Sequence, residues 1–200
     1  MRLPIASMTL ITAGLIAGSA NLAKAADEPN NAFRFGAAWV VPDGEASVSG
    51  GNSLDAQDEL GYFVDYERRL IPWLGLDFQV LYATPSFDVL DTTGATVSEK
   101  SVEVWTGSAG VNFHFFGRSR FDLYLGAFGG YTDFSEDADG TYSYGGVLGF
   151  DIGLTKNGLV LTTSVRYSVT DAEADSTTPY PGTSIPYDPL VYQLGLGWRF

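Results

Sequence analysis

Apolar and polar residues alternate with a period of two in eight separate segments of the chain. The last segment shows the pattern clearly, because small or polar residues separate the apolar positions Leu190, Tyr192, Leu194, Leu196, Trp198 and Phe200. The other segments are residues 33–41, 60–68, 74–82, 105–115, 121–131, 144–154 and 159–169. Successive side chains of a β-strand point to opposite faces, so each segment is predicted to be a strand with one apolar face.

The connections between these segments alternate in length. Polar stretches follow the odd-numbered segments, at 42–59, 84–101, 132–143 and 170–188, whereas tight turns follow the even-numbered ones, at 69–73, 116–120 and 156–158. The Asn157-Gly158 pair in the last turn supplies the positive φ that hairpin turns favour. Long external loops and short periplasmic turns are typical of a transmembrane barrel with an even number of strands.

A soluble β-sandwich is the alternative architecture. It has no reason to sort its loops by length, and it would not bury the mid-strand carboxylates Asp65, Asp77 and Asp151 beside glycines. A water-wet or ion-paired lumen tolerates such residues. The sequence therefore predicts an all-β fold, an eight-stranded antiparallel transmembrane β-barrel with up-and-down topology.

The first 25 residues have the features of a secretory signal peptide. A positive start at Arg2 precedes an apolar stretch at 5–20 and an Ala-Lys-Ala site at 23–25. A membrane anchor is the alternative, but the apolar stretch is short and interrupted by Ser, Thr and Gly. We expect a cleaved signal peptide at 1–25 and a barrel at 26–200, exported through the periplasm to the outer membrane of a Gram-negative cell.

The composition excludes several classes of function. The chain has 24 Asp and Glu residues against 11 Lys and Arg residues, which argues against nucleic-acid binding because that requires a basic footprint. The absence of cysteine from the sequence rules out a disulfide framework and a thiolate metal site. We expect no cofactor and no metal.

Four stretches carry a resemblance to a known family. They are residues 34–42, 76–85, 124–132 and 188–200, with Ala-Thr-Pro after a strand at 83–85 and Asp-Pro before one at 188–189. In order and spacing they resemble the OmpW family of small eight-stranded outer-membrane proteins. The resemblance implies a barrel whose narrow, partly apolar lumen admits small hydrophobic molecules, which leave sideways through the wall into the membrane. It implies no substrate preference, because the loops vary across the family.

Inward positions in the periplasmic half of the predicted barrel include charges of both signs: Arg34, Glu67, Asp77, Asp151 and Arg199. Opposite charges in a confined, low-dielectric space stabilise one another, whereas an isolated one is costly. These residues predict a salt-bridged plug. The plug is either a closed floor that stops water and ions or a purely structural core.

Inward positions in the outer half are mainly apolar: Val40, Phe63, Leu81, Phe128 and Val147, with Arg166 as a charge among them. An apolar cup above a polar plug would accept a hydrophobic molecule from outside and leave lateral release as its exit. The alternative is that Phe63 and Phe128 simply fill the bore, since eight strands enclose little more than side chains or one small ligand.

Aromatic residues fall where the two membrane interfaces should lie. Trp73, Trp198 and Phe200 stand near the periplasmic rim, and Trp39 and Tyr82 near the outer rim. This placement predicts interfacial aromatic belts, with ordinary hydrophobic packing as the alternative.

Two patterns suggest other chemistry, and neither is complete. His114 lies at the periplasmic end of its strand, the wrong end for an outer-membrane acyl hydrolase, so we expect no enzyme. The stretch 133–140 resembles a calcium loop but lacks its first Asp and its closing Glu. Loop carboxylates could instead associate with the divalent cations that bridge lipopolysaccharide.

The sequence favours a passive uptake channel for small hydrophobic molecules. The alternative is a non-transporting structural or adhesive barrel that acts through its extracellular loops. The expected partners are outer-membrane lipid and lipopolysaccharide, a small hydrophobic ligand, and the barrel-assembly machinery, which would recognise the C-terminal strand ending at Phe200. We expect a monomer.

Overall fold

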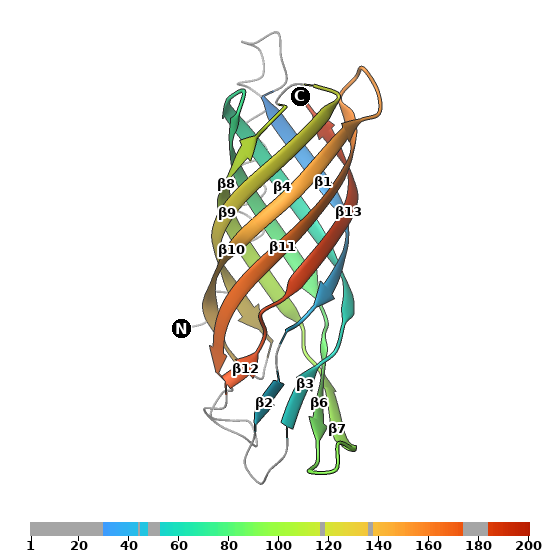
Figure 1. Ribbon diagram of the computed structural model, residues 1–200, viewed down its shortest axis with the longest axis vertical. Helices are drawn as coiled ribbons and strands as arrows, with labels where there is room; N and C mark the ends of the chain where they lie inside the picture. The colour runs from blue at the N-terminus through green and yellow to red at the C-terminus, as the bar shows by residue number, and fades with distance from the viewer. Residues whose placement is uncertain (1–29, 44, 48–52, 117–118, 136–137, 174–183) are drawn as a thin grey trace.

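The computed structural model describes residues 30–43, 45–47, 53–116, 119–135, 138–173 and 184–200. Within these residues, eight long strands follow the alternating segments and close into one antiparallel barrel (Figure 1). They are β1 (Asn31–Val41), β4 (Glu59–Ile71), β5 (Leu74–Ala83), β8 (Val104–His114), β9 (Phe121–Phe134), β10 (Ala138–Gly153), β11 (Leu159–Glu173) and β13 (Leu190–Arg199). The predicted fold class is confirmed, while the predicted signal peptide at 1–25 lies outside the described residues.

Each barrel strand pairs with its neighbours along the chain, and the first pairs with the last. The order is β10-β9-β8-β5-β4-β1-β13-β11, and a further pairing between β10 and β11 completes the circle. β1 and β13 pair from Ala32 opposite Arg199 to Val41 opposite Leu190. Closure matters because an unpaired strand edge would leave backbone N–H and C=O groups without partners in lipid.

Short turns join the strands at the end of the barrel where the C-terminus lies (Figure 1). In the turn between β10 and β11, Gly158 has a φ of 92°, as the Asn-Gly pair predicts. The backbone N–H of Leu154 donates to the carbonyl of Leu159 at 2.8 Å and closes this hairpin. We call this the periplasmic end, and the opposite end the mouth.

The long connections form structure that the alternation does not predict. β2 (Glu45–Ser47), β3 (Ser53–Ala56), β6 (Ser86–Leu90) and β7 (Thr96–Ser101) make a four-stranded sheet, in the order β2-β3-β6-β7. Figure 1 shows this sheet projecting beyond the mouth. β12 (Ser184–Pro186) pairs with the last residues of β11. The connections therefore extend the barrel beyond the mouth.

The prediction of an acidic loop at 132–143 is wrong. β9 continues to Phe134, β10 begins at Ala138, and Thr132 pairs with Thr141 in the ladder between them. The rings of Tyr131 and Tyr142 pack edge to face at 5.6 Å on the outside of this hairpin. Inward hydroxyls and outward aromatic rings keep the strand pattern intact despite the neighbouring acidic residues.

The outward side chains form an apolar belt around the barrel. Its exposed members include Phe35, Val64, Phe78, Val111, Leu125, Leu148, Val165 and Leu194. No helix in the described part of the chain is long and apolar enough to cross a membrane.

A charge introduced into the middle of this belt should destabilise the barrel in lipid. Leu194 is 60% exposed at mid-strand in β13. We expect Leu194→Arg to lower the free energy of unfolding by about 2–4 kcal/mol, the usual cost of Arg at the bilayer midplane. Urea titration of the protein folded into phospholipid vesicles measures this. Val97→Arg in β7, outside the barrel, should change stability little, and equal effects of the two variants would contradict a lipid-facing belt.

Candidate functional site in the lumen

Charged side chains gather inside the periplasmic half and the middle of the barrel, because each stands at an inward position of its strand. Among the described residues they comprise four guanidiniums, five carboxylates and one imidazole, all buried or nearly so: Arg34, Arg69, Arg166, Arg199, Asp65, Glu67, Asp77, Asp122, Asp151 and His114. Burying so many charges in a low-dielectric bore is too costly in free energy unless oppositely charged groups pair. Opposite charges do pair here, in two connected groups.

Arg34 on β1 is the centre of the first group of ion pairs. Its side chain is almost fully buried, and its Nη1 lies 2.7 Å from Asp65 Oδ1 on β4. Its Nη2 lies 3.1 Å from Glu67 Oε2 and 3.0 Å from Asp151 Oδ2. Because Asp151 comes from β10, this guanidinium bridges strands on different sides of the barrel. The ring of Tyr124 covers it, with 5.3 Å between Cζ and the ring centroid.

A second group of charges lies nearer the periplasmic rim. The imidazole of His114 stands between two carboxylates, with its Nε2 3.0 Å from Glu67 Oε1 and its Nδ1 3.0 Å from Asp122 Oδ2. Arg69 contacts the same two carboxylates, and Arg199 Nη2 lies 3.3 Å from Asp122 Oδ2. Arg199 also reaches Asp151 at 3.1 Å and so joins the two groups into one network.

An amide pair crosses the lumen on the mouth side of these charges. Gln79 on β5 and Gln193 on β13 exchange two side-chain hydrogen bonds of 3.2 and 3.0 Å, although their strands are not neighbours in the barrel. The hydroxyl of Ser164 donates to Gln193 Oε1 at 2.8 Å. The bore is therefore bridged by hydrogen bonds as well as by ion pairs.

A small cavity of about 10 Å³ lies at this level. Arg166, Asp77, Asn112 and the glutamine pair line it on the polar side, and Phe63 and Val147 contribute apolar surface. This volume holds about one water molecule. The cavity marks the boundary between the polar and the apolar parts of the lumen.

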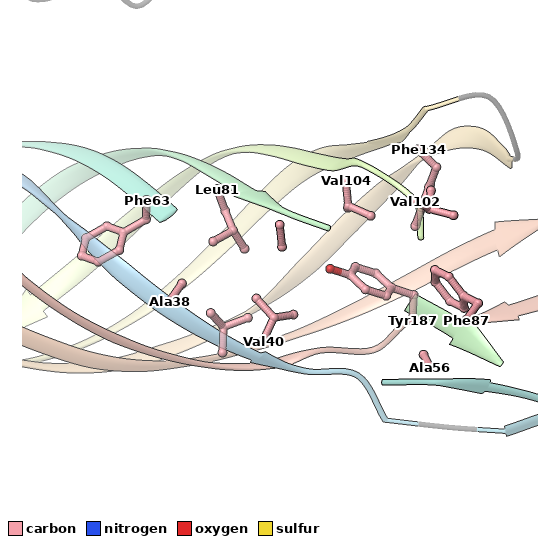
Figure 2. Packing of buried hydrophobic residues seen from close by; sticks show 12 residues of the cluster. Ala38, Val40, Ala56, Phe63, Leu81, Phe87, Val102, Val104, Phe134 and Tyr187 are labelled. Atoms are coloured by element: carbon pink, nitrogen blue, oxygen red, sulfur yellow. The ribbon is translucent and has the colours of Figure 1, made fainter. Parts of the chain in front are cut away.

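The lumen toward the mouth contains a large apolar cluster and a short row of hydroxyls. Buried apolar residues from strands that include β1, β4, β5, β8, β9 and β13 form one continuous cluster, which includes Ala38, Val40, Phe63, Leu81, Ala83, Val104, Phe134 and Val191 (Figure 2). The hydroxyls of Thr106, Thr132 and Ser143 on the adjacent strands β8, β9 and β10 are linked by hydrogen bonds.

Tyr187, in the segment between β12 and β13, lies in the middle of this cluster at the mouth, where the cluster continues into the outer four-stranded sheet with Ala56 and Phe87 (Figure 2). Only 2% of Tyr187 is exposed, and its ring packs edge to face against Phe134 with centroids 5.4 Å apart. Figure 2 shows its hydroxyl directed from the mouth toward the barrel interior. Burial raises the pKa of Tyr187 well above its ordinary value.

Solved structures share this architecture. OprG from Pseudomonas aeruginosa is 18% identical, with a TM-score of 0.74 over 86% of this chain and 97% of that one. AlkL in lipid bilayers is 18% identical, with a TM-score of 0.59 over 88% and 93%. The Neisserial surface protein NspA is 14% identical, with a TM-score of 0.58 over 88% and 100%. No protein-family model and no curated protein matches the chain.

This chain has the fold of the small outer-membrane β-barrels. The fold implied by the resemblance to the OmpW family is thereby confirmed. At these identities the likeness concerns the architecture alone.

The structure brings the five residues expected in the plug into one network: Arg34, Glu67, Asp151 and Arg199 through ion pairs, and Asp77 through Asn112, whose amide donates to both Glu67 and Asp77. Asp77 also contacts Arg166 at 3.4 Å, closer to the middle of the lumen. Sequence reasoning left Asp65, Arg69, His114, Asp122 and Asn112 out of the plug. All five occupy inward positions of their strands, so the two-residue alternation could have identified them as residues of the lumen.

The five residues expected in the apolar cup are all buried. Val40, Phe63 and Leu81 belong to the apolar cluster. Phe128 and Val147 lie beside Arg166: its guanidinium stands 4.1 Å from the Phe128 ring centroid, and Val147 borders the same cavity. Their surroundings are therefore mixed rather than purely apolar.

The aromatic residues expected at the interfaces face outward. Trp39, Trp73, Trp198 and Phe200 are each more than a third exposed, and Tyr82 packs against Trp105 with centroids 4.6 Å apart. Trp73 stacks on Phe113 at the periplasmic end. In the described residues no group of side chains is arranged to hold a metal ion.

Removing the guanidinium of Arg34 should strongly destabilise the barrel. Arg34→Met would leave Asp65, Glu67 and Asp151 without their shared cation in a buried site. The loss of one partner from such a site usually costs about 3–5 kcal/mol. Urea titration of the folded protein in vesicles measures the change. Lys156→Met, at an exposed turn position, is the control, and a similarly small effect of both variants would show that Arg34 does not hold the network together.

Proposed function

We propose that the protein is an outer-membrane channel for passive uptake of small hydrophobic molecules. The molecules would enter the apolar mouth half of the lumen from outside and leave laterally into the membrane, without chemical turnover. The observation that carries this proposal is that a single bore is apolar in its mouth half and bridged by ion pairs in its periplasmic half. The resemblance to the OmpW family supports the same function.

The lower part of the lumen favours a closed floor. Arg34, Arg199 and the Gln79–Gln193 pair link strands across the bore, so a molecule passing straight down would have to break several buried polar contacts at once. An apolar molecule offers no replacement for those contacts. It would therefore stop above the floor.

A lateral exit requires a place where the wall can part. The pairing of β10 with β11 ends at Ser143 opposite Thr170, and residues 138–142 of β10 then pair only with β9. The last residues of β11 pair instead with β12. We propose this seam as the exit, because widening it breaks few ladder hydrogen bonds.

A structural or adhesive barrel is the second candidate. The four-stranded sheet β2-β3-β6-β7 projects beyond the mouth and offers a surface for partners outside the cell. The tight filling of the lumen also suits a barrel that transports nothing. The two candidates differ in whether the lumen takes up apolar molecules.

A polar side chain inside the apolar cluster should slow uptake. Leu81 is buried on β5 and nearly isosteric with glutamine, so Leu81→Gln places an unsatisfied amide where the molecule would pass. We expect the uptake of n-octane into proteoliposomes to fall several-fold from the wild-type rate. Val97→Gln outside the barrel is the matched control. Wild-type uptake no faster than that of protein-free vesicles would leave the structural or adhesive candidate.

Shortening Tyr187 should open the mouth. Tyr187→Ala removes the ring that packs against Phe134, and we expect faster uptake of the same apolar probe. Tyr187→Phe retains the ring and should keep the wild-type rate. If Tyr187→Ala leaves uptake unchanged, this side chain does not limit access to the lumen.

A further inference from the structure

Arg166 is more loosely held than the other buried guanidinium near the lumen centre. It is 5% exposed, and among the described residues its polar contacts are Asp77 Oδ2 at 3.4 Å and Ser108 Oγ at 3.0 Å. Arg34, by contrast, makes four contacts of 2.7–3.2 Å with three carboxylates. A guanidinium has five N–H donors, so Arg166 retains capacity for another acceptor.

Arg166 also stands where the two parts of the lumen meet. Its guanidinium lies over the ring of Phe128, and it borders the cavity that Phe63 and Val147 share with Asp77. A molecule whose hydrocarbon part filled the mouth half of the lumen would therefore place its inner end at Arg166. The cavity of about 10 Å³ has room for one oxygen-sized group.

We propose that Arg166 binds the hydrogen-bond acceptor of a neutral amphipathic ligand, such as the oxygen of a ketone, an ester or an alcohol. The hydrocarbon part of the ligand lies among Val40, Phe63 and Leu81. This inference rests on the proposed uptake function and specifies the class of molecule that the lumen selects.

Charge limits the ligand to neutral molecules. The mouth connections 42–58, 84–103 and 171–189 contain twelve Asp and Glu residues and one basic residue, Lys100, so the mouth repels anions. At the inner end, a cation would meet Arg34 and Arg166, and the two carboxylates that line the same cavity, Asp65 and Asp77, are already paired with them. A neutral acceptor meets neither barrier, and it gains a charge-assisted hydrogen bond that a plain alkane cannot make.

The test compares four eight-carbon probes on the full barrel in lipid nanodiscs: n-octane, 2-octanone, octanoate and octylammonium. Binding is measured against empty nanodiscs, and the guanidinium 15N resonance of Arg166 is followed at the same time. We expect 2-octanone to bind about tenfold more tightly than n-octane, the usual gain from a hydrogen bond to a charged group. It should also shift the Arg166 resonance, while n-octane does not and the two charged probes bind more weakly than 2-octanone.

Two variants assign the preference to this side chain. Arg166→Met combined with Asp77→Asn removes the guanidinium while keeping the charge of the lumen unchanged, and it should reduce the preference for 2-octanone over n-octane to less than about twofold. Ser108→Ala keeps the guanidinium and should retain the preference.

The outcomes separate this inference from the function on which it rests. Equal binding of n-octane and 2-octanone by the wild type, or a preference that survives in the double variant, overturns the role of Arg166 and leaves hydrophobic uptake standing. If no probe binds beyond the empty-nanodisc level, both proposals fall.

Discussion

An eight-stranded barrel encloses a bore only about as wide as the side chains that point into it. Each inward residue therefore touches residues from several other strands, and no charged group can avoid its neighbours. In this chain Arg34 meets carboxylates from β4 and β10 at once, and Arg199 from β13 joins them to the rim. The ion-pair network follows from that confinement, and the position of the network leaves the apolar residues to fill the mouth half.

The barrel itself could be predicted because side chains alternate between the lipid-facing and the lumen-facing side at every second residue. Lipid outside and a packed lumen inside impose one alternation on all eight strands, and the short turns add signals such as Asn157-Gly158. The sheet β2-β3-β6-β7 could not be predicted in this way. Its strands have three to six residues, too short for a period of two to stand out. The 132–143 hairpin was missed because its acidic residues suggested a loop, although Thr132 and Tyr142 keep the strand parity.

The two-residue alternation predicts only part of the lumen. It identifies which residues point inward, but the contact partners of those residues depend on how the long side chains reach across the bore. Asp77 was expected in the plug, and it also pairs with Arg166 from β11, which was expected among the apolar residues of the outer half. Likewise Gln79 and Gln193 meet although they are more than a hundred residues apart and lie on strands that do not pair. Such contacts depend on barrel shear and side-chain rotamers, which a single sequence does not display.

The two halves of the lumen place different demands on a passing molecule. In the periplasmic half the polar groups already pair with one another, so an apolar molecule would make no favourable contact there that replaces them. The mouth half is held by apolar packing that includes Tyr187, so a hydrophobic molecule there would exchange apolar contacts for apolar contacts. Arg166 lies where these two regimes meet and has donors to spare. Under the proposed uptake function, selectivity would be set at the inner end of the apolar lumen and access at its mouth.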